Sequence, residues 1–247
     1  MAQQPPKIVI IGAGIGGLAA ALRLAHQGCE VTVLDMHGAA GGKMRTVPSA
    51  AGPVDAGPTV LTMRPVFEAL FADVDEELSA HLTLEPLATL ARHYWDDGTQ
   101  LDLMADPAHS LSNVTAAFGS KAGQEFARFS ARAQRLFAAF DAPMMHARAP
   151  RQWAMTKTVL GNPSLIPDMA PHRTMAGLLK SSFRNPQLAQ LFGRYATYVG
   201  GSPHASPAIL SLIWHAEAQG VWSVNGGIQR LAQTIAELAK SRGAEFH

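Results

Sequence analysis

The 247-residue sequence has one cysteine, few charged residues and no recognisable metal-ligand pattern. The single Cys29 excludes a disulfide within the chain and is typical of a reducing compartment, so we expect a cytoplasmic protein. Charged residues make up 16% of the chain and the formal net charge is +1, which gives no electrostatic basis for binding nucleic acid. The ten histidines lack metal-ligand spacing and there is no G-x-S-x-G motif, so we expect neither a metal site nor a serine hydrolase.

The region before residue 36 carries the most specific pattern. Residues 8–11 are typical of a buried parallel strand, a G-x-G-x-x-G motif occupies residues 12–17, and a second strand pattern at 30–34 is followed by Asp35. In a dinucleotide site such glycines permit the tight turn, the approach of backbone to a diphosphate and close helix packing. The helix N-terminus attracts the diphosphate, and an acid about 18 residues beyond the last glycine binds the ribose. The predicted contacts are Gly12, Gly14, Ile15, Gly17 and Asp35.

Two other interpretations of this segment are disfavoured. A secretory signal peptide would need more than Lys7 as its basic region and has no use for three spaced glycines. A membrane-spanning helix is disfavoured because Arg23 interrupts the uncharged run short of the ~20 residues needed to span a bilayer. The segment therefore predicts a nucleotide site.

A second glycine loop lies just beyond Asp35. Residues 41–43, Gly-Gly-Lys, can fold back over the same diphosphate, with Lys43 or Arg45 neutralising its charge. A Walker-type phosphate loop is excluded because Met44 occupies its Ser/Thr position. A plain glycine turn is the alternative.

The middle of the chain predicts three further elements. Residues 54–60 read as a strand opened by a Gly-Pro step, and residues 84–103 as a β-hairpin with an Asp-Gly turn. Residues 123–141 have helical apolar spacing, which favours a core-facing stripe, although its aromatic residues could also line a tunnel for a long polyene. We expect the polar residues of this helix on the surface: Glu125, Arg128, Arg132 and Arg135.

The second half is marked by prolines and glycines. Residues 144–171 are rich in proline and carry Met144, Met145, Trp153 and the basic residues Arg148, Arg151 and Lys157. They predict a long loop, or a monotopic membrane contact in which apolar side chains enter the interface and cations meet anionic head groups. Residues 185–186 and 206–207 each combine an N-cap side chain with proline at a helix start. The glycine pair at 226–227 precedes a helix that ends at a glycine, and residues 244–247 begin a strand.

The motifs GAGIGGLAAALRLAHQGCEVTVLD, GGK and VDAGPTVLT, together with residues 198–246, resemble the FAD-dependent carotenoid desaturases. These form the bacterial phytoene-desaturase group of the flavin amine-oxidase superfamily. Within this group, the motifs are most similar to those of the hydroxyneurosporene-type (1-hydroxycarotenoid 3,4-) desaturases of photosynthetic bacteria. The resemblance covers both ends of the chain and matches the middle only in general pattern.

The resemblance implies an α/β fold: a Rossmann-type FAD-binding domain with a mostly helical substrate or lid insertion. Its parts would be residues 1–83, 84–220 and 221–247, and we expect the chain to be the N-terminal half of a longer enzyme. Two departures are Asp35, where the family usually has Glu, and Ala39, where the superfamily often has a basic residue. The implied FAD contacts beyond the first motif are Gly42, Lys43 and Arg45 at the diphosphate and Pro58, Thr59 and Val60 beside the flavin ring.

The implied reaction removes two hydrogens from adjacent carbons of an acyclic carotenoid, one as hydride to the flavin and one as a proton to a base or water. The implied partners are a lipophilic, 1-hydroxylated polyene, a quinone or oxygen as electron acceptor, and a membrane surface to which the protein binds peripherally. The catalytic base stays unknown: His204, His215 and Arg194 are candidates, and each is more often structural. The alternatives are an amine oxidase and a nucleotide-binding half without turnover; an NAD enzyme is disfavoured by the second glycine pair.

Overall fold

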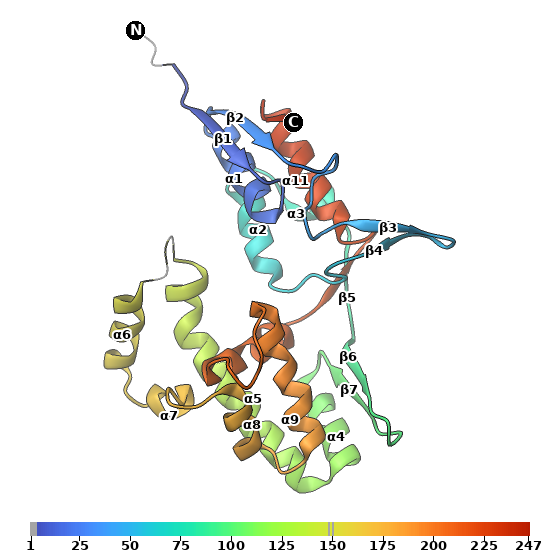
Figure 1. Cartoon of the computed structure of the whole chain (residues 1–247), viewed down its shortest axis with the longest axis vertical. Coiled ribbons are helices and arrows are strands. Elements are labelled where there is room, and N and C mark those ends of the chain that lie inside the picture. The colour runs from blue at the N-terminus through green and yellow to red at the C-terminus, as the bar shows by residue number, and fades with distance from the viewer. Residues whose placement is uncertain (1–3, 148, 150) are drawn as a thin grey trace. The chain divides into compact units, whose positions relative to one another are not determined.

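The computed structural model describes residues 4–147, 149 and 151–247, except for the side chain of Met145. The chain divides into two compact units, which are described separately. Unit 1 consists of Met1–Leu87 and Val221–His247, and unit 2 of Ala88–Gly220. Figure 1 shows the elements of each unit.

Unit 1 contains a parallel sheet in the order β1-β2-β9. Each residue of β1 pairs with one of β2, from Lys7 opposite Glu30 to Ile11 opposite Leu34. The two strands predicted from the apolar runs are therefore confirmed, as is the strand expected near the end of the chain. The strands are β1 (Lys7–Ile11), β2 (Glu30–Leu34) and β9 (Glu245–Phe246).

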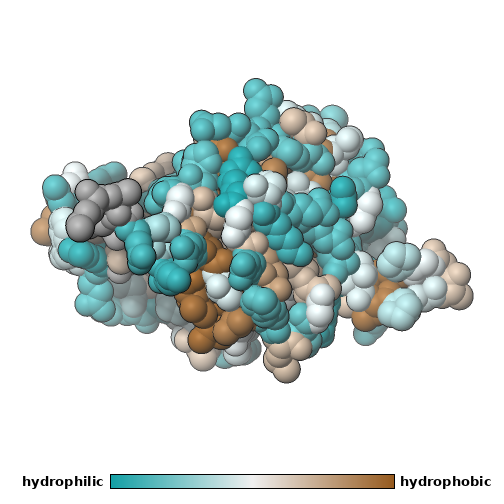
Figure 2. Space-filling model, turned by 90° about the horizontal axis from the view of Figure 1, so that it is seen from above, coloured by the Kyte–Doolittle hydropathy of each residue, from teal (hydrophilic) through white to brown (hydrophobic). Residues whose placement is uncertain are grey.

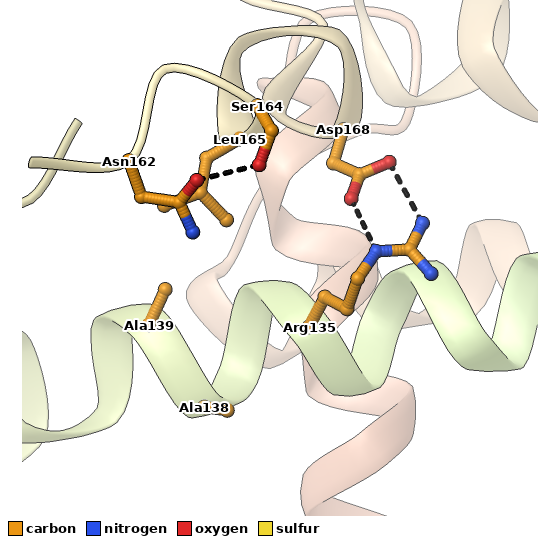
Figure 3. A pocket seen from close by; sticks show the side chains of 7 residues that line it. All are labelled: Arg135, Ala138, Ala139, Asn162, Ser164, Leu165 and Asp168. Carbon is orange, nitrogen blue, oxygen red and sulfur yellow. Dashed lines mark hydrogen bonds and ion pairs between the residues drawn. The ribbon is translucent and has the colours of Figure 1, made fainter. Parts of the chain in front are cut away.

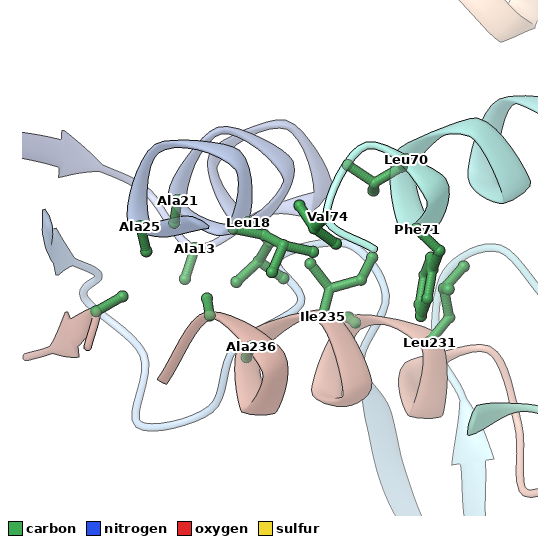
Figure 4. Packing of buried hydrophobic residues seen from close by; sticks show 14 of the residues in the cluster. Ala13, Leu18, Ala21, Ala25, Leu70, Phe71, Val74, Leu231, Ile235 and Ala236 are labelled. Atoms are coloured by element: carbon green, nitrogen blue, oxygen red, sulfur yellow. The ribbon is translucent and has the colours of Figure 1, made fainter. Parts of the chain in front are cut away.

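Two helices far apart in sequence form the core of unit 1. α1 (Ile15–His26) and α11 (Gln229–Ser241) pack against each other, and α2 (Arg64–Ala72) closes the cluster beside them (Figure 4). Each fully buried Leu or Ile stabilises the fold by about 1.5–3 kcal/mol, so this packing ties the end of the chain to its beginning. Fully buried large side chains of this core include Leu18, Leu22, Phe71, Leu231 and Ile235.

Short elements complete unit 1. β3 (Thr46–Ser49) and β4 (Gly52–Asp55) form an antiparallel hairpin, β5 (Leu84–Pro86) pairs with β8 (Trp222–Val224), and α3 is Leu78–His81. The strand predicted at 54–60 is right only for Val54 and Asp55, which belong to β4, and wrong beyond them because pairing ends at Asp55. Beyond it a Cβ on Gly57 would lie 2.0 Å from the carbonyl oxygen of Lys43, and Pro58 has no N–H to donate.

Unit 2 begins with the predicted β-hairpin. β6 (Thr89–Tyr94) pairs antiparallel with β7 (Gln100–Met104), and Gly98 takes a positive φ of 82° in the turn. The start of the prediction is wrong, because Leu84 belongs to β5 and pairs with Val224 of β8 in unit 1.

The rest of unit 2 is helical. The predicted helix at 123–141 is α5, and its apolar stripe is a core: Phe129 lies 4.7 Å from Phe192, ring centre to ring centre. The segments are α4 (Pro107–Phe118), α5 (Ser120–Phe140), the π-helix η1 (Asp141–Met145), α6 (Gln152–Gly161), α7 (Leu165–Met169), α8 (Met175–Ser182), α9 (Pro186–Gly193), the 3-10 helices η2 (Arg194–Val199) and η3 (Ala208–Leu212), and α10 (Ile213–Ala218).

Two polar residues of α5 correct the sequence analysis. Glu125 and Arg132 were expected on the surface but are 6% and 9% exposed. Glu125 accepts a hydrogen bond from the backbone N–H of Arg184, and Arg132 donates to Ser211 Oγ at 2.7 Å. Partners distant in sequence offset the cost of burying both charges.

The later helix signals had mixed outcomes. Asn185 caps α9 as predicted, accepting from two backbone N–H groups, whereas the side chain of Ser206 caps no helix and a 3-10 helix follows Pro207. The long loop expected at 144–171 is wrong, because this stretch forms α6 and α7; its Arg148 and Pro150 lie outside the described residues. Among the described helices, none is long and apolar enough to cross a bilayer.

A candidate dinucleotide site in unit 1

The first glycine motif forms a tight turn between β1 and α1. Gly12 has a φ of 101° and donates its N–H to the carbonyl of Leu34 at 2.7 Å. A Cβ on Gly17 would lie 2.0 Å from the carbonyl oxygen of Gly12. Only glycine fits at position 17, because α1 crosses the turn at backbone contact distance.

Gly14 faces open space at the start of α1. Its backbone is extended, with φ −71° and ψ 173°, and a Cβ placed on it would have no heavy atom within 4 Å. No side chain caps α1, so the N–H groups of its first turn, beginning at Ile15, are available to an anion. The turn therefore has the shape and polarity of a diphosphate cradle.

The second glycine loop returns to the first. Gly41 donates its N–H to the carbonyl of Ala13 at 2.8 Å, and a Cβ on Gly42 would lie 3.0 Å from the Cα of Gly14. Gly41 and Gly42 have φ values of 134° and 58°, which glycine adopts most easily. A side chain in this loop would enter the space beside the α1 N-terminus.

A cleft of about 520 Å³ lies beside the second loop. Lys43 and Arg45 line it, and among the described residues neither forms an ion pair. Thr59 and Val60, which the sequence placed beside a flavin, are exposed and do not line this cleft. An excess of positive charge suits a ligand with two phosphates. The lining residues are His37, Gly42, Lys43, Arg45, Ala56, Gly57 and Pro58.

Asp35 lies at the end of β2 with its carboxylate directed to the glycine turn. One oxygen accepts the N–H of Ala13 at 2.7 Å and the other that of His37 at 2.8 Å. The bond from Ala13 is the main cause of a lowered pKa for this carboxyl, so Asp35 is ionised at neutral pH. Each oxygen has a second lone pair for a ribose hydroxyl.

Asp55 is a residue that sequence reasoning missed. It ends β4, and one carboxylate oxygen accepts the N–H of Ile228 at 3.2 Å, just before α11. A Cβ on Gly227 would lie 3.1 Å from the other oxygen, which is buried without a partner among the described residues. Asp55 thus anchors the start of α11 to the loop that borders the cleft. The sequence signal for this residue was an acid before the Gly-Pro step.

The three candidate bases lie in unit 2. Arg194 is held in an ion pair with Glu217 at 2.5 Å; burial opposes its charge, but Tyr195 and Glu217 leave its pKa raised, which removes it as a proton acceptor. Burial lowers the pKa of His215, whose ring packs 5.3 Å from that of Phe137. His204 is exposed in a loop. Within the described part of the chain, no cluster of His, Cys, Asp or Glu could hold a metal ion.

Comparison with known proteins identifies the class. Residues 15–247 match the family described as "Flavin containing amine oxidoreductase", so the chain belongs to this family, and FAD is the cofactor that membership indicates. The fold prediction is confirmed at this level: putrescine oxidase and the cyclohexylamine oxidase of Brevibacterium oxydans share the fold, with TM-scores of 0.62 and 0.56 at 16% and 19% identity. The chain covers 51% of each, and they cover 98% and 99% of it.

More similar in sequence are proteins named hydroxyneurosporene desaturase. Identity is 51% with that of Cereibacter sphaeroides, 48% with that of Rhodobacter capsulatus and 40% with that of Rubrivivax gelatinosus. These matches cover 97–100% of this chain and 46–50% of each relative. The chain therefore spans about half the length of the relatives it matches.

Proposed function

We propose that this chain is the FAD-binding portion of an enzyme that desaturates an acyclic, 1-hydroxylated carotenoid in carotenoid biosynthesis. The observation that carries the proposal is the contact of two glycine loops around open space at the N-terminus of α1. The identity of 40–51% with three hydroxyneurosporene desaturases supports the choice of substrate.

In this proposal unit 1 holds the cofactor. Gly14, Gly42 and the first N–H groups of α1 would hold the diphosphate. Lys43 and Arg45 neutralise its charge, and Asp35 accepts hydrogen bonds from the ribose. Pro58, Thr59 and Val60 would border the flavin ring, as the resemblance implies. When bound, FAD supplies the acceptor for the two hydrogens that desaturation removes.

Unit 2 in this proposal contacts the polyene. A substrate without charged groups dissolves in the bilayer rather than in water, so the enzyme works at a membrane surface and takes its substrate from there. A quinone or oxygen would serve as the final electron acceptor. Arg194 acts structurally, which leaves His204, His215 or a water molecule to take the proton.

The test is flavin retention by the purified chain, followed as visible absorption before and after the protein is denatured. The expected result is about one FAD per chain. A chain that folds but takes up no flavin from a solution containing FAD would contradict the assignment of unit 1.

A further inference from the structure

One helix of unit 2 presents apolar side chains to solvent without a partner. None of the ten residues of α6, all of them described, is buried, although Trp, Met, Val, Leu and Ala make up half of them. Trp153 is 60% exposed, Leu160 75%, and Ile166 of the neighbouring α7 47%. Exposed apolar side chains that gather on one element mark a contact with a partner molecule or a membrane. We call residues 151–169 the α6–α7 arm.

The exposed residues of α6 follow one face. Trp153, Lys157 and Leu160 lie four and then three positions apart, which places them on a single stripe of the helix. The other exposed residues of α6 on this face are Gln152, Thr156 and Gly161. The lysine in the middle can lay its apolar stem along this stripe and keep its ammonium at the head-group level. Trp at one end suits the boundary between acyl chains and water.

The arm carries only positive charge as far as residue 167, and its one acid, Asp168, is paired with Arg135 of α5. The sequence has no acidic residue from 142 to 167, whereas Arg151 and Lys157 are exposed on the arm. Among the described residues, neither forms an ion pair. A basic surface with exposed apolar side chains complements the anionic face of a bilayer.

The arm is fastened at its base. Arg135 of α5 forms two hydrogen bonds with the carboxylate of Asp168, at 2.7 and 3.0 Å (Figure 3). Leu165 is 4% exposed and packs at the same place, next to a cavity of about 490 Å³. Figure 1 shows α6 at the outer edge of unit 2, joined to it through α7. Because the base of the arm is fixed to α5, insertion of α6 into a bilayer would hold unit 2 at a defined depth relative to the membrane surface.

We infer that the α6–α7 arm is a monotopic contact with an anionic phospholipid bilayer, in which Trp153 and Leu160 enter the interface and Arg151 and Lys157 meet the lipid phosphates. The inference rests on the proposed function, because a substrate dissolved in the bilayer requires such a contact. It deepens that function by naming the surface and the lipid charge. Apolar residues also show among hydrophilic ones on the face drawn in Figure 2, so the control variants must remove exposed apolar groups elsewhere.

The experiment is flotation of the purified chain with phosphatidylcholine vesicles, with and without phosphatidylglycerol. The variant Trp153→Ser with Leu160→Ser is expected to lower the partition coefficient about tenfold or more. Its control is Tyr94→Ser with Val47→Ser, which removes an aromatic and an aliphatic group that are 67% and 47% exposed. The control is expected to bind as the unaltered chain does.

A second pair of variants tests the charges. Arg151→Gln with Lys157→Gln is expected to weaken binding to the anionic vesicles about 25-fold, or about fivefold for each charge, and to remove most of the salt dependence. The control, Lys121→Gln with Arg128→Gln, removes the same charge from exposed positions of α5. Since every substituted side chain is exposed, the thermal unfolding midpoint of all variants should stay unchanged.

Several outcomes would overturn the inference: no binding of the unaltered chain to anionic vesicles, equal binding to neutral ones, or equal losses in the arm and control variants. A change of oligomeric state in the Trp153 variant with undiminished vesicle binding would assign the stripe to a second copy of the chain. Flavin absorption of the same preparations separates the two proposals. If the chain contains FAD but the arm variants bind vesicles as well as the unaltered chain does, only the inference about the arm is rejected. If the arm variants lose vesicle binding but the chain contains no FAD, only the proposed function is rejected.

Discussion

Replacing Gly14 with valine should separate cofactor binding from folding. Gly14 is extended, with φ −71° and ψ 173°, a conformation open to any residue, and an added Cβ meets no protein atom within 4 Å. Valine should therefore leave the stability of the chain unchanged or raise it by up to about 1 kcal/mol, because it restricts the unfolded chain. The side chain would instead occupy the space assigned to the diphosphate.

The loss of affinity can be estimated from the contacts that the valine would displace. Two backbone hydrogen bonds to a charged group contribute about 1.5–3 kcal/mol each. Their loss raises the dissociation constant of FAD by at least about a hundredfold. The control is Gly16→Ala, at an exposed position of the first turn of α1 that also has open space around its Cβ.

The assay is a titration of flavin-free protein with FAD, followed by fluorescence, together with a thermal melt of each variant. We expect Gly14→Val to melt as the unaltered chain does and to bind FAD at least about a hundredfold more weakly. Gly16→Ala should bind normally. A folded Gly14→Val protein whose dissociation constant stays within about threefold of the original would refute the position of the diphosphate.

Three further results are expected. Gly17→Ala should destabilise the chain by about 3 kcal/mol or more, because its Cβ would overlap the Gly12 carbonyl, and a melt with an unchanged midpoint would count against the close crossing of α1. Lys43→Ala should weaken FAD by ~1–3 kcal/mol in the same titration, and equal affinity would remove Lys43 from the site. Burial lowers the pKa of His93 from 6.5 to about 4, so its neutral form stabilises the fold above pH 6.5 and this contribution is lost as the pH falls toward 4. Denaturant titrations of His93→Gln should lack that part of the pH dependence.

The elements that sequence analysis predicted well are those set by local patterns. β1 and β2 follow from two apolar runs, and Gly12 and Gly17 are required by the backbone of a single turn. The helix α11 could also be predicted, because a glycine pair before it and Gly243 after it mark both ends of an amphipathic helix.

The features that were missed depend on partners distant in sequence. Glu125 meets the backbone of Arg184, and Asp55 meets Ile228, contacts that no local pattern reveals. α6 was expected to be a loop for a different reason: it buries no residue, and its exposed stripe mixes apolar with polar side chains, so the sequence has no purely apolar periodicity from which a helix could be predicted.

The measurement that tests the central claim most directly is a chimera in which this chain replaces the matching half of the Cereibacter sphaeroides hydroxyneurosporene desaturase. The purified chimera would be incubated with hydroxyneurosporene in liposomes and a quinone, and the pigments separated by chromatography, with the Gly14→Val chimera as control. We expect a product with one more conjugated double bond from the chimera and none from the control. A folded chimera that binds flavin but forms no such product, or that oxidises amines instead, would contradict the proposed function.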